Sequence, residues 1–225
     1  LELNFMSKVI LVTGASSGIG KSIATYLHEK GYKVFGTSRN PKNTENFSFQ
    51  MIALDVLKVE TIEKAVAYII KKEGRLDVLI NNAGMGITGP IEDTPTDEMR
   101  AVFNTNLFGA IDVMKAVLPQ MRLQKHGMIL NVTSIAGYMG LPFRGLYSAT
   151  KGALELVTES ISMEVKSFGI SVVNIAPGDF ATNIAAGRYH TPIFENSAYK
   201  ENYQANLDLM DAHVNGGMNP LEMAK

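Results

Sequence analysis

The sequence contains four polar side chains of types that can together move a proton to and from a carbonyl group: Asn106, Ser134, Tyr147 and Lys151. Tyr147 and Lys151 are the most informative of the four. The pair opens a strongly helical stretch. Residues four apart share one face of a helix, so the Lys151 ammonium can approach the Tyr147 phenol. A phenol titrates at about pH 10, and a nearby positive charge lowers that pKa. We therefore interpret Tyr147 as a candidate general acid and base.

The same spacing of tyrosine and lysine occurs twice more, at Tyr26/Lys30 and Tyr68/Lys72. Each of these pairs falls late in an expected helix and away from the end of a strand. We interpret both as surface pairs, which is also what a pair of this spacing means in most helices. The position of Tyr147 and Lys151 along the chain, rather than their spacing, singles them out.

Ser134 ends a run, 127–134, that has the composition of a buried strand. In an open parallel sheet, ligands bind beyond the carboxyl ends of the strands. A hydroxyl there can hydrogen-bond to a carbonyl oxygen while Tyr147 protonates it. The alternative is a serine that only ends the strand or caps a turn, but the tyrosine–lysine helix that follows favours the catalytic interpretation.

A glycine-rich turn, TGASSGIG at 13–20, follows the first expected strand and opens the first expected helix. Glycines let the backbone turn sharply and approach a pyrophosphate, which the free N–H groups of the helix N-terminus stabilise. A ligand-free turn is the alternative. The residues expected to contact a nucleotide here are Gly14, Ser16, Ser17, Gly18, Ile19 and Gly20.

The second expected strand ends at Thr37–Ser38–Arg39. A dinucleotide site that prefers NAD would carry an acidic residue near this point to hold the ribose 2′-hydroxyl, and none is present. An arginine suits a 2′-phosphate through charge-assisted hydrogen bonds. The sequence therefore predicts NADP(H), with Ser38 and Arg39 at the adenosine end. A solvated loop cation is the alternative for Arg39.

Short apolar runs alternate with amphipathic segments, which predicts a parallel sheet covered on both faces. We expect one Rossmann-type, doubly wound, three-layer α/β/α domain over residues 1–225. The expected strands are Lys8–Thr13, Tyr32–Thr37, Phe49–Leu54, Asp77–Asn81, Met128–Thr133 and Ile170–Ile175; the expected helices are Gly18–Lys30, Val59–Lys72, Thr96–Gln120 with a break, and Tyr147–Phe168. From Pro177 the pattern weakens, and we interpret about 178–215 as a flap over the substrate.

The composition of the chain argues against several classes of function. The net charge is −1 with no long basic run, so nothing points to nucleic acid or an anionic membrane. The absence of cysteine excludes disulfides and thiolate sites, and the four histidines show no metal-ligand spacing. No apolar run approaches the roughly 20 residues of a membrane span, and no signal peptide is recognisable, so the cytoplasm is the expected location.

With these motifs in hand, the chain closely resembles the short-chain dehydrogenase/reductase family over nearly its whole length. The motifs that carry the resemblance follow one another in a fixed order. They are TGASSGIG at 13–20, Asp55–Val56, Asn81–Asn82–Ala83–Gly84, Asn106, Ser134, Tyr147/Lys151 and Pro177–Gly178.

The resemblance implies a role for each position. Tyr147 would be the acid and base, Ser134 would orient the carbonyl, Lys151 would lower the phenol pKa and hold the nicotinamide ribose, and Asn106 would hold a water for proton relay. Further cofactor contacts would come from Asp55, Val56, Asn82, Ala83, Gly84, Pro177, Gly178 and Thr182. Three structural alternatives stay open: Asp55 as a helix N-cap, Asn106 as a helix-kinking residue, and 81–84 as a plain turn.

The residues expected around the substrate are apolar, which favours a bulky hydrophobic alcohol or ketone. They are Met85, Ile87, Met139, Leu141, Pro142, Phe143, Leu146, Phe180, Ile184, Tyr189, Ile193 and Phe194. Packing of the flap or of a subunit interface is the alternative. The stretch from Ser134 to Lys166 resembles the hydroxysteroid and retinol dehydrogenase branch of the family.

The resemblance also implies a homodimer or homotetramer, formed through the long helices that follow Asn106 and Tyr147. Apolar residues lie on more than one face of these helices: Leu107, Ile111, Val113, Val117, Leu154, Val157, Ile161 and Val165. Family members usually have a seventh strand after the flap. None is recognisable before Lys225, so the sixth strand is expected at an exposed edge.

Two other functions compete with an NADP(H)-dependent oxidoreductase. A non-catalytic nucleotide sensor or interaction protein can share the fold, but such relatives commonly lose the tyrosine or the lysine, and both are present here. A sugar epimerase or dehydratase would need a tighter glycine turn and a large C-terminal substrate domain, and the sequence has neither.

Overall fold

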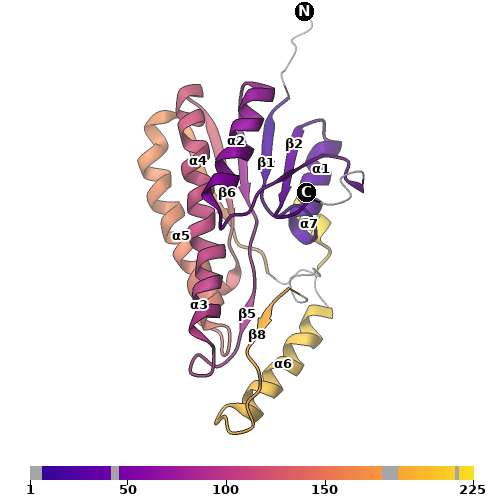
Figure 1. Cartoon of the computed structure of the whole chain (residues 1–225), viewed down its shortest axis with the longest axis vertical. Helices are drawn as coiled ribbons and strands as arrows, with labels where there is room; N and C mark the ends of the chain where they lie inside the picture. The colour runs from indigo at the N-terminus through magenta and orange to yellow at the C-terminus, as the bar shows by residue number, and fades with distance from the viewer. Residues whose placement is uncertain (1–6, 42–45, 179–186, 216–217) are drawn as a thin grey trace, which may run out of the picture.

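The centre of the protein is a parallel sheet with six strands in the order β3-β2-β1-β4-β6-β7 (Figure 1). The computed structural model describes residues 7–41, 46–178, 187–215 and 218–225. The strands are β1 (Val9–Val12), β2 (Lys33–Ser38), β3 (Gln50–Ala53), β4 (Val78–Asn81), β6 (Gly127–Val132) and β7 (Ile170–Ile175). The strand order reverses between β1 and β4, which is where doubly wound folds bind ligands. The predicted Rossmann-type fold is confirmed.

Helices cover both faces of the sheet. They are α1 (Gly18–Glu29), α2 (Val59–Glu73), α3 (Thr96–Phe103), α4 (Gly109–Gln124), α5 (Gly145–Val165), α6 (Lys200–Asn215) and α7 (Pro220–Ala224), with a π-helical segment at Asn104–Phe108 and 3₁₀ turns at Ile135–Tyr138 and Lys166–Phe168. The break expected in the third helix is this π-helical segment. The expected strands and helices all form, with ends that differ by a few residues.

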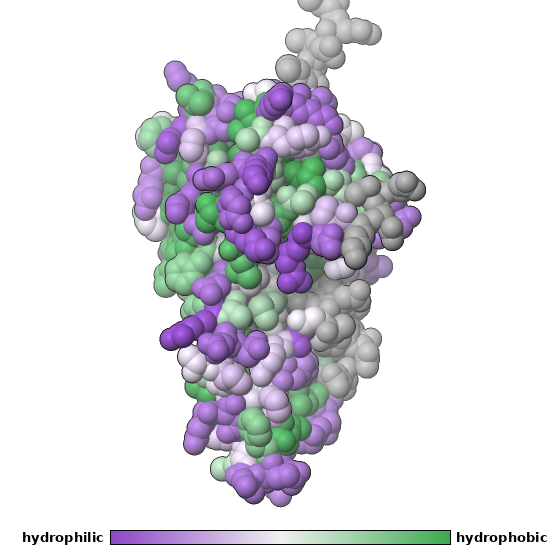
Figure 2. Space-filling model, viewed as in Figure 1, coloured by the Kyte–Doolittle hydropathy of each residue, from purple (hydrophilic) through white to green (hydrophobic). Residues whose placement is uncertain are grey.

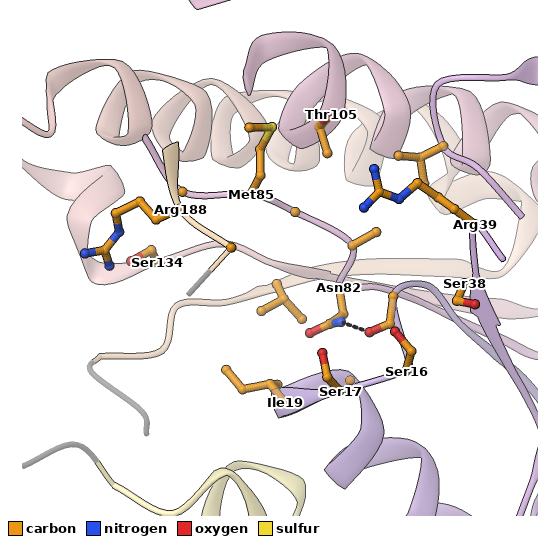
Figure 3. Close-up of a pocket in the computed structure, with 18 of the residues that line it drawn as sticks. Ser16, Ser17, Ile19, Ser38, Arg39, Asn82, Met85, Thr105, Ser134 and Arg188 are labelled. Atoms are coloured by element: carbon orange, nitrogen blue, oxygen red, sulfur yellow. Dashed lines mark hydrogen bonds between the residues drawn. The ribbon is translucent and has the colours of Figure 1, made fainter. Parts of the chain in front are cut away.

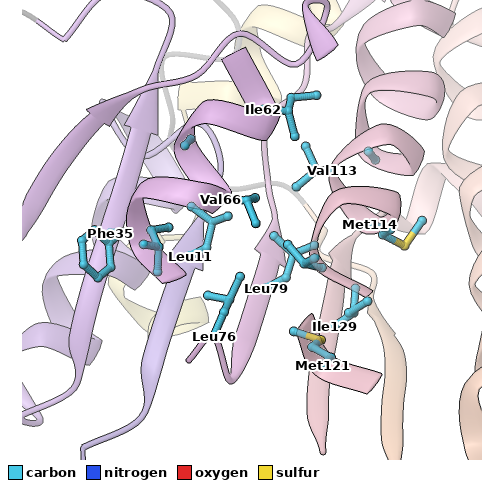
Figure 4. Packing of buried hydrophobic residues seen from close by; sticks show 14 of the residues in the cluster. Leu11, Phe35, Ile62, Val66, Leu76, Leu79, Val113, Met114, Met121 and Ile129 are labelled. Carbon is cyan, nitrogen blue, oxygen red and sulfur yellow. The ribbon is translucent and has the colours of Figure 1, made fainter. Parts of the chain in front are cut away.

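The core has two parts because successive strand side chains point to opposite faces of the sheet. Leu11, Leu79 and Ile129 pack against α2, α4 and α5 on one face (Figure 4). Ile10 and Ile80 belong to the second cluster, on the face that α1 and α7 cover. Burial on both faces explains why the strands read as nearly continuous apolar runs.

The eight apolar residues expected at a subunit interface belong to this core or pack against it. Four of them are buried, and four pack against the buried cluster: Val113, Val117, Leu154 and Val165; Leu107, Ile111, Val157 and Ile161. The large hydrophobic side chains that are exposed on α4 and α5 include Leu123, Leu156 and Met163.

The helical run Thr96–Gln124 is long and apolar enough to cross a membrane, judged by length and composition alone. The expectation that no segment would approach this limit was therefore wrong for this helix. Packing accounts for its apolar side chains, since Val113, Val117 and Met121 are fully buried against the sheet. Core helices of this kind share the composition of membrane spans.

Beyond the carboxyl ends of the strands lie α6 and a second, two-stranded sheet made of β5 (Ile87–Thr88) and β8 (Tyr189–His190) (Figure 1). Tyr203 of α6 is 1% exposed, and its hydroxyl donates a hydrogen bond to the main-chain oxygen of Thr88, 3.0 Å away. Its ring packs against Phe143, with 5.3 Å between centroids. The described part of the predicted flap, 187–215, is thus attached to the loops around the site.

β7 forms one edge of the sheet in the described part of the chain, as expected. Val173 and Ile175, which point to the face opposite α5, are 42% and 37% exposed. On the other face Ile170 and Val172 are buried against α5. The burial of β7 is therefore one-sided.

Candidate active site

A pocket of about 630 Å³ lies at the carboxyl ends of the strands, beside the point where the strand order reverses. It brings together most of the predicted site residues: Gly14, Ser16, Ser17, Ile19, Gly20, Ser38, Arg39, Asp55, Val56, Asn82, Ala83, Gly84, Ser134, Tyr147, Lys151, Pro177 and Gly178. Gly18 and Asn106 lie outside the lining, and Thr182 falls outside the described residues.

The glycine turn between β1 and α1 needs its glycines. Gly14 and Gly18 have φ of +66° and +56°, the left-handed region that disfavours residues with a Cβ. A Cβ on Gly20 would overlap the Asn82 amide and the main-chain oxygen of Gly14. Ser17, the N-cap of α1, makes no side-chain capping hydrogen bond within the described structure, so its side chain leaves the first N–H groups of the helix available to an anion. Figure 3 shows Ser16, Ser17 and Ile19 at this side of the pocket. This cradle fits a diphosphate.

Asn82 holds the turn in place. Its side-chain amide donates to the main-chain oxygens of Thr13, at 2.9 Å, and Gly14, at 3.1 Å. The Thr13 hydroxyl accepts hydrogen bonds from the main-chain N–H groups of Asn82 and Ala83, both at 3.0 Å. The loop after β4 therefore braces the glycine turn as well as lining the pocket, so both interpretations of 81–84 have a structural basis.

Arg39 and Asp55 line the part of the pocket in which the sequence predicts the adenosine of the cofactor. Arg39 is exposed and forms no ion pair with another described residue, and Figure 3 shows its guanidinium turned toward the pocket. The Asp55 carboxylate accepts from the main-chain N–H of Leu57, at 3.1 Å. The N-cap of α2 is Lys58, so the alternative of Asp55 as a helix N-cap is wrong.

Lys151 is the buried cation of the site. Its side chain comes from α5, only 6% of the residue is exposed, and its ammonium donates to the main-chain oxygen of Val132, 2.8 Å away. Burial lowers the pKa of Lys151 from 10.5 to about 8, because the charged form loses solvation. The ammonium lies 5.8 Å from the centroid of the Tyr147 ring.

The distance from the lysine ammonium to the tyrosine ring does not distinguish Tyr147/Lys151 from the other two tyrosine–lysine pairs. The lysine ammonium lies 5.2 Å from the ring centroid in Tyr26/Lys30 and 5.9 Å in Tyr68/Lys72. None of those four residues lines the pocket. Tyr147 and Lys151 differ by lying at the end of β6, beside the glycine turn.

Asn106 lies in the π-helical segment and is 1% exposed. Its side-chain oxygen accepts from the main-chain N–H of Met85 at 2.8 Å, and its amide donates to the Met85 oxygen at 2.9 Å and to the Thr150 hydroxyl at 3.2 Å. Asn106 thus fastens the loop after β4 to α5, one residue from Lys151. The alternative interpretation of Asn106 was a helix-kinking residue, and Asn106 does lie where the regular α-helix is interrupted.

Ser134 lies two residues beyond the end of β6 and is 8% exposed. Its hydroxyl oxygen accepts from the main-chain N–H of Ala136 at 3.2 Å, which caps the 3₁₀ turn 135–138. That bond uses a lone pair and leaves the hydroxyl proton free to be donated. The capping interpretation and the catalytic one are therefore compatible.

Two pocket residues, Arg144 and Arg188, were missed from the sequence. Arg144 is the N-cap residue of α5, and its guanidinium carbon lies 5.7 Å from the Tyr147 ring centroid. Its position three residues before Tyr147 could have revealed it, because i and i+3 are neighbours on a helix. Arg188 follows the last motif, Pro177–Gly178, by ten residues and matches none of the motifs; the pairing of β8 with β5 begins at the next residue, Tyr189.

The predicted apolar substrate lining is only partly present. Met85 and Ile87 line the pocket, whereas Phe143 packs against Tyr203. The other described members lie outside the lining: Met139, Leu141, Pro142, Leu146, Tyr189, Ile193 and Phe194. Phe180 and Ile184 fall outside the described residues. Within the described residues, no three histidine or acidic side chains gather as metal ligands would.

Comparison with known proteins gives consistent matches. The sequence profile of the family described as short chain dehydrogenase matches residues 8–192. A 3-ketodihydrosphingosine reductase from Bacteroides thetaiotaomicron is 41% identical over 218 residues, which cover 96% of this chain and 80% of the relative. These matches support the family; they do not single out the hydroxysteroid and retinol branch expected from the sequence.

Solved structures agree in fold. A short-chain dehydrogenase from Streptomyces avermitilis superposes with a TM-score of 0.85 at 37% identity, covering 97% of this chain and 81% of that one. An NAD+-bound xylitol dehydrogenase gives 0.73 at 33%, covering 77% and 70%, and ElxO with NADP bound gives 0.81 at 29%, covering 97% and 89%. With the family profile spanning most of its length, this chain belongs to the short-chain dehydrogenase/reductase family.

Proposed function

We propose that this protein is an NADP(H)-dependent oxidoreductase that interconverts an alcohol and a carbonyl on a hydrophobic substrate. The observation that carries the proposal is the position of Tyr147 and Lys151, which line one pocket together with Ser134 and the glycine turn. A nicotinamide cofactor bound there would supply the hydride chemistry.

The chain's own residues would supply position and protonation. The Tyr147 phenol would donate its proton to the carbonyl oxygen during reduction and accept it back in the reverse reaction. The Ser134 hydroxyl would donate a hydrogen bond to the same oxygen and fix its place. The Lys151 ammonium would stabilise the phenolate left on Tyr147, which brings the phenol pKa nearer to neutral.

The choice of NADP(H) rests on Arg39. Its exposed guanidinium stands at the adenosine end of the pocket, where it can bind a 2′-phosphate through paired hydrogen bonds. The pocket also contains Asp55, one strand further along the sheet, which suits the adenine amino group. One similar solved structure contains NAD+ and another contains NADP, so the comparisons do not choose between the two cofactors. The choice of NADP(H) therefore depends on Arg39.

The choice of a hydrophobic substrate rests on Met85 and Ile87, which line the pocket beyond Gly84. The relative from Bacteroides is named for a lipid-like ketone. A long-chain ketone is therefore the substrate class proposed here, with reduction as the direction to assay first.

Two measurements test the proposal. Calorimetric titration with NADPH and NADH should show tighter binding of NADPH, and Arg39→Gln should remove that preference. Tyr147→Phe should abolish NADPH-dependent reduction of a long-chain ketone, while Tyr26→Phe, which alters a matched pair outside the pocket, should leave it unchanged. Full activity in Tyr147→Phe would show that the mechanism is wrong. Binding of NADPH with no turnover of any ketone would favour the nucleotide-sensing alternative.

A further inference from the structure

Phe143 has a backbone conformation that is unusual for its residue type. Its φ is +59°, in the left-handed region that disfavours residues with a Cβ. It is the third residue of a tight turn, in which the main-chain N–H of Arg144 donates to the Leu141 oxygen at 3.0 Å and Pro142 is the second residue. Turns with proline second and a positive φ third usually carry glycine or asparagine at the third position. Contacts around Phe143 must therefore offset the cost of this conformation.

The turn is fixed first from β5. The Thr88 hydroxyl and the main-chain N–H of Gly89 both donate to the main-chain oxygen of Phe143, at 3.0 Å and 2.8 Å. Ile87, in the same strand, lines the pocket. Helix α5 begins two residues after Phe143 and carries Tyr147 in its first turn. These two hydrogen bonds therefore join a strand of the pocket wall to the start of the helix that carries Tyr147.

Helix α6 covers this junction. Its residues Tyr203 and Met210 are buried and lie seven apart, so they share one face of the helix. The Tyr203 hydroxyl donates to the main-chain oxygen of Thr88 at 3.0 Å, and the Met210 sulfur lies 3.9 Å from the Thr88 hydroxyl oxygen. The outer surface at this end of the molecule, where α6 lies in Figure 1, carries many hydrophilic side chains (Figure 2).

The ring of Phe143 is held by the same helix. It packs against the Tyr203 ring with 5.3 Å between centroids and 44° between planes. Neither residue is among the described residues that line the pocket. Any effect of the two rings on a reaction in the pocket must therefore pass through residues that do line it, such as Ile87 and Tyr147.

We propose that Phe143 and Tyr203 are positioning residues, whose ring contact fastens α6 to the turn before α5 and so fixes Tyr147 relative to the pocket wall at Ile87. The inference rests on the proposed carbonyl reduction and adds to it two residues outside the pocket. Proton transfer requires the phenol to lie within hydrogen-bond reach of the carbonyl oxygen. A small displacement of the first turn of α5 would therefore slow the reaction, while the glycine turn between β1 and α1 would still bind the cofactor.

Kinetics of Tyr203 variants test this role. Tyr203→Leu should lower kcat for NADPH-dependent reduction of a long-chain ketone by about tenfold or more, because small misplacements of reacting groups are costly. KM and the calorimetric Kd for NADPH should not change. Tyr203→Phe keeps the ring pair and should retain most of the activity. Tyr68→Leu is the matched control, since it removes a ring from the Phe35–Tyr68 pair outside the pocket and should leave kcat unchanged.

Two substitutions of Phe143 separate positioning from general stability. Phe143→Gly and Phe143→Ala both remove the ring contact, but only glycine adopts the positive φ without strain. The glycine variant should therefore have the higher Tm, while kcat should fall to a similar degree in both. Adding Tyr203→Leu to Phe143→Gly should lower kcat little further, because both changes break one contact. A kcat that follows Tm across these variants would overturn the inference.

A spectrum separates failure of this inference from failure of the proposed function. The ¹³Cζ resonance of Tyr147 in tyrosine-labelled protein, assigned with Tyr147→Phe, reports the surroundings of the phenol without turnover. It should shift in Tyr203→Leu and stay in place in Tyr68→Leu. A wild type that reduces no ketone would contradict the proposed function, and the spectrum would still test the positioning. An unchanged Tyr147 resonance in Tyr203→Leu, or a wild-type kcat in that variant, would overturn the inference.

Discussion

The ammonium of Lys151 donates a hydrogen bond to the main-chain oxygen of Val132, across the junction of α5 and β6. The residue is 6% exposed, and burial lowers its pKa to about 8. This contact places the cation beneath the pocket, at the strand end that also presents Ser134. The protein therefore keeps a poorly solvated charge next to Tyr147, which is costly for folding and which the proposed mechanism uses to stabilise a phenolate.

That cost predicts a pH dependence of stability. Below about pH 8 Lys151 is protonated both folded and unfolded, and the folded state bears the full desolvation penalty. Between about pH 8 and 10.5 only the unfolded state keeps the proton, so the penalty is relieved as pH rises. The stability of the wild type relative to Lys151→Met should thus rise over this window, by an amount on the order of a few kcal/mol.

Urea unfolding of the ligand-free chain at pH 8 and pH 10 measures this difference. Lys64→Met, which changes an exposed lysine of α2, is the control and should show no such trend. A constant difference between wild type and Lys151→Met across the window would mean that the buried lysine titrates normally.

Gly20→Ala should prevent nucleotide binding and destabilise the fold. Its Cβ would overlap the Asn82 amide and the main-chain oxygen of Gly14, which are fixed by the hydrogen bonds of the turn. Gly140→Ala is the control, because a Cβ there meets no described atom within 4 Å. Thermal unfolding with and without NADPH should show a lowered Tm and no NADPH-induced shift for Gly20→Ala only. An undiminished shift in that variant would contradict the assignment of the turn.

Asn106→Ala should destabilise the protein by about 1–3 kcal/mol, because it removes the side-chain partners of the Met85 N–H and oxygen. Asn104→Ala, on the exposed side of the same π-helical segment, should cost much less. Urea unfolding gives both values. Hydrogen exchange at Met85 should quicken in the first variant; unchanged protection there would show that Asn106 does not hold the loop.

Asp77 should make the fold sensitive to acid. Burial raises the pKa of its carboxyl, but hydrogen bonds from Arg75, from the main-chain N–H of Val9 and from His126 outweigh burial and lower the pKa overall. A lowered carboxyl pKa stabilises the fold above the unfolded value of about 3.9 and loses that effect as pH falls through the folded value.

Asp77→Asn should therefore be less stable than the wild type by about 1–3 kcal/mol at neutral pH, with a gap that narrows as pH falls below the unfolded carboxyl value of about 3.9. Asp97→Asn, whose side chain is 97% exposed, serves as the control. Urea unfolding from pH 7 to pH 3 measures the gap. A gap of constant size would show that the carboxyl pKa is not lowered.

Local sequence was enough to predict most of the fold. Buried strands read as apolar runs, and α1 and α2 as amphipathic patterns, because burial on one or both faces constrains residue type locally. The glycine turn was predictable for a similar reason, since positive φ and close backbone approach leave few residue choices at Gly14, Gly18 and Gly20. A break within Thr96–Gln120 was foreseen, but not its position at Asn104–Phe108 or its π-helical form.

The substrate end of the pocket was not predictable in the same way. Most of the described apolar residues expected there lie outside the pocket lining, and the apolar residues of α4 and α5 that were expected at an interface are buried in the core or packed against it. The sequence shows that a side chain is apolar, but it does not show whether that side chain contacts a ligand, a partner subunit or the protein's own core.

The sequence by itself determined the fold, the nucleotide-binding turn and the tyrosine–lysine pair, because each depends on residues that are neighbours along the chain. Only the tertiary structure decided how Asn106 holds the loop at Met85 and how Arg188 reaches the pocket. Arg188 arrives through the pairing of Tyr189 with Ile87, a contact between segments far apart in sequence. Such contacts depend on how strands and loops meet in space, and no local pattern records them.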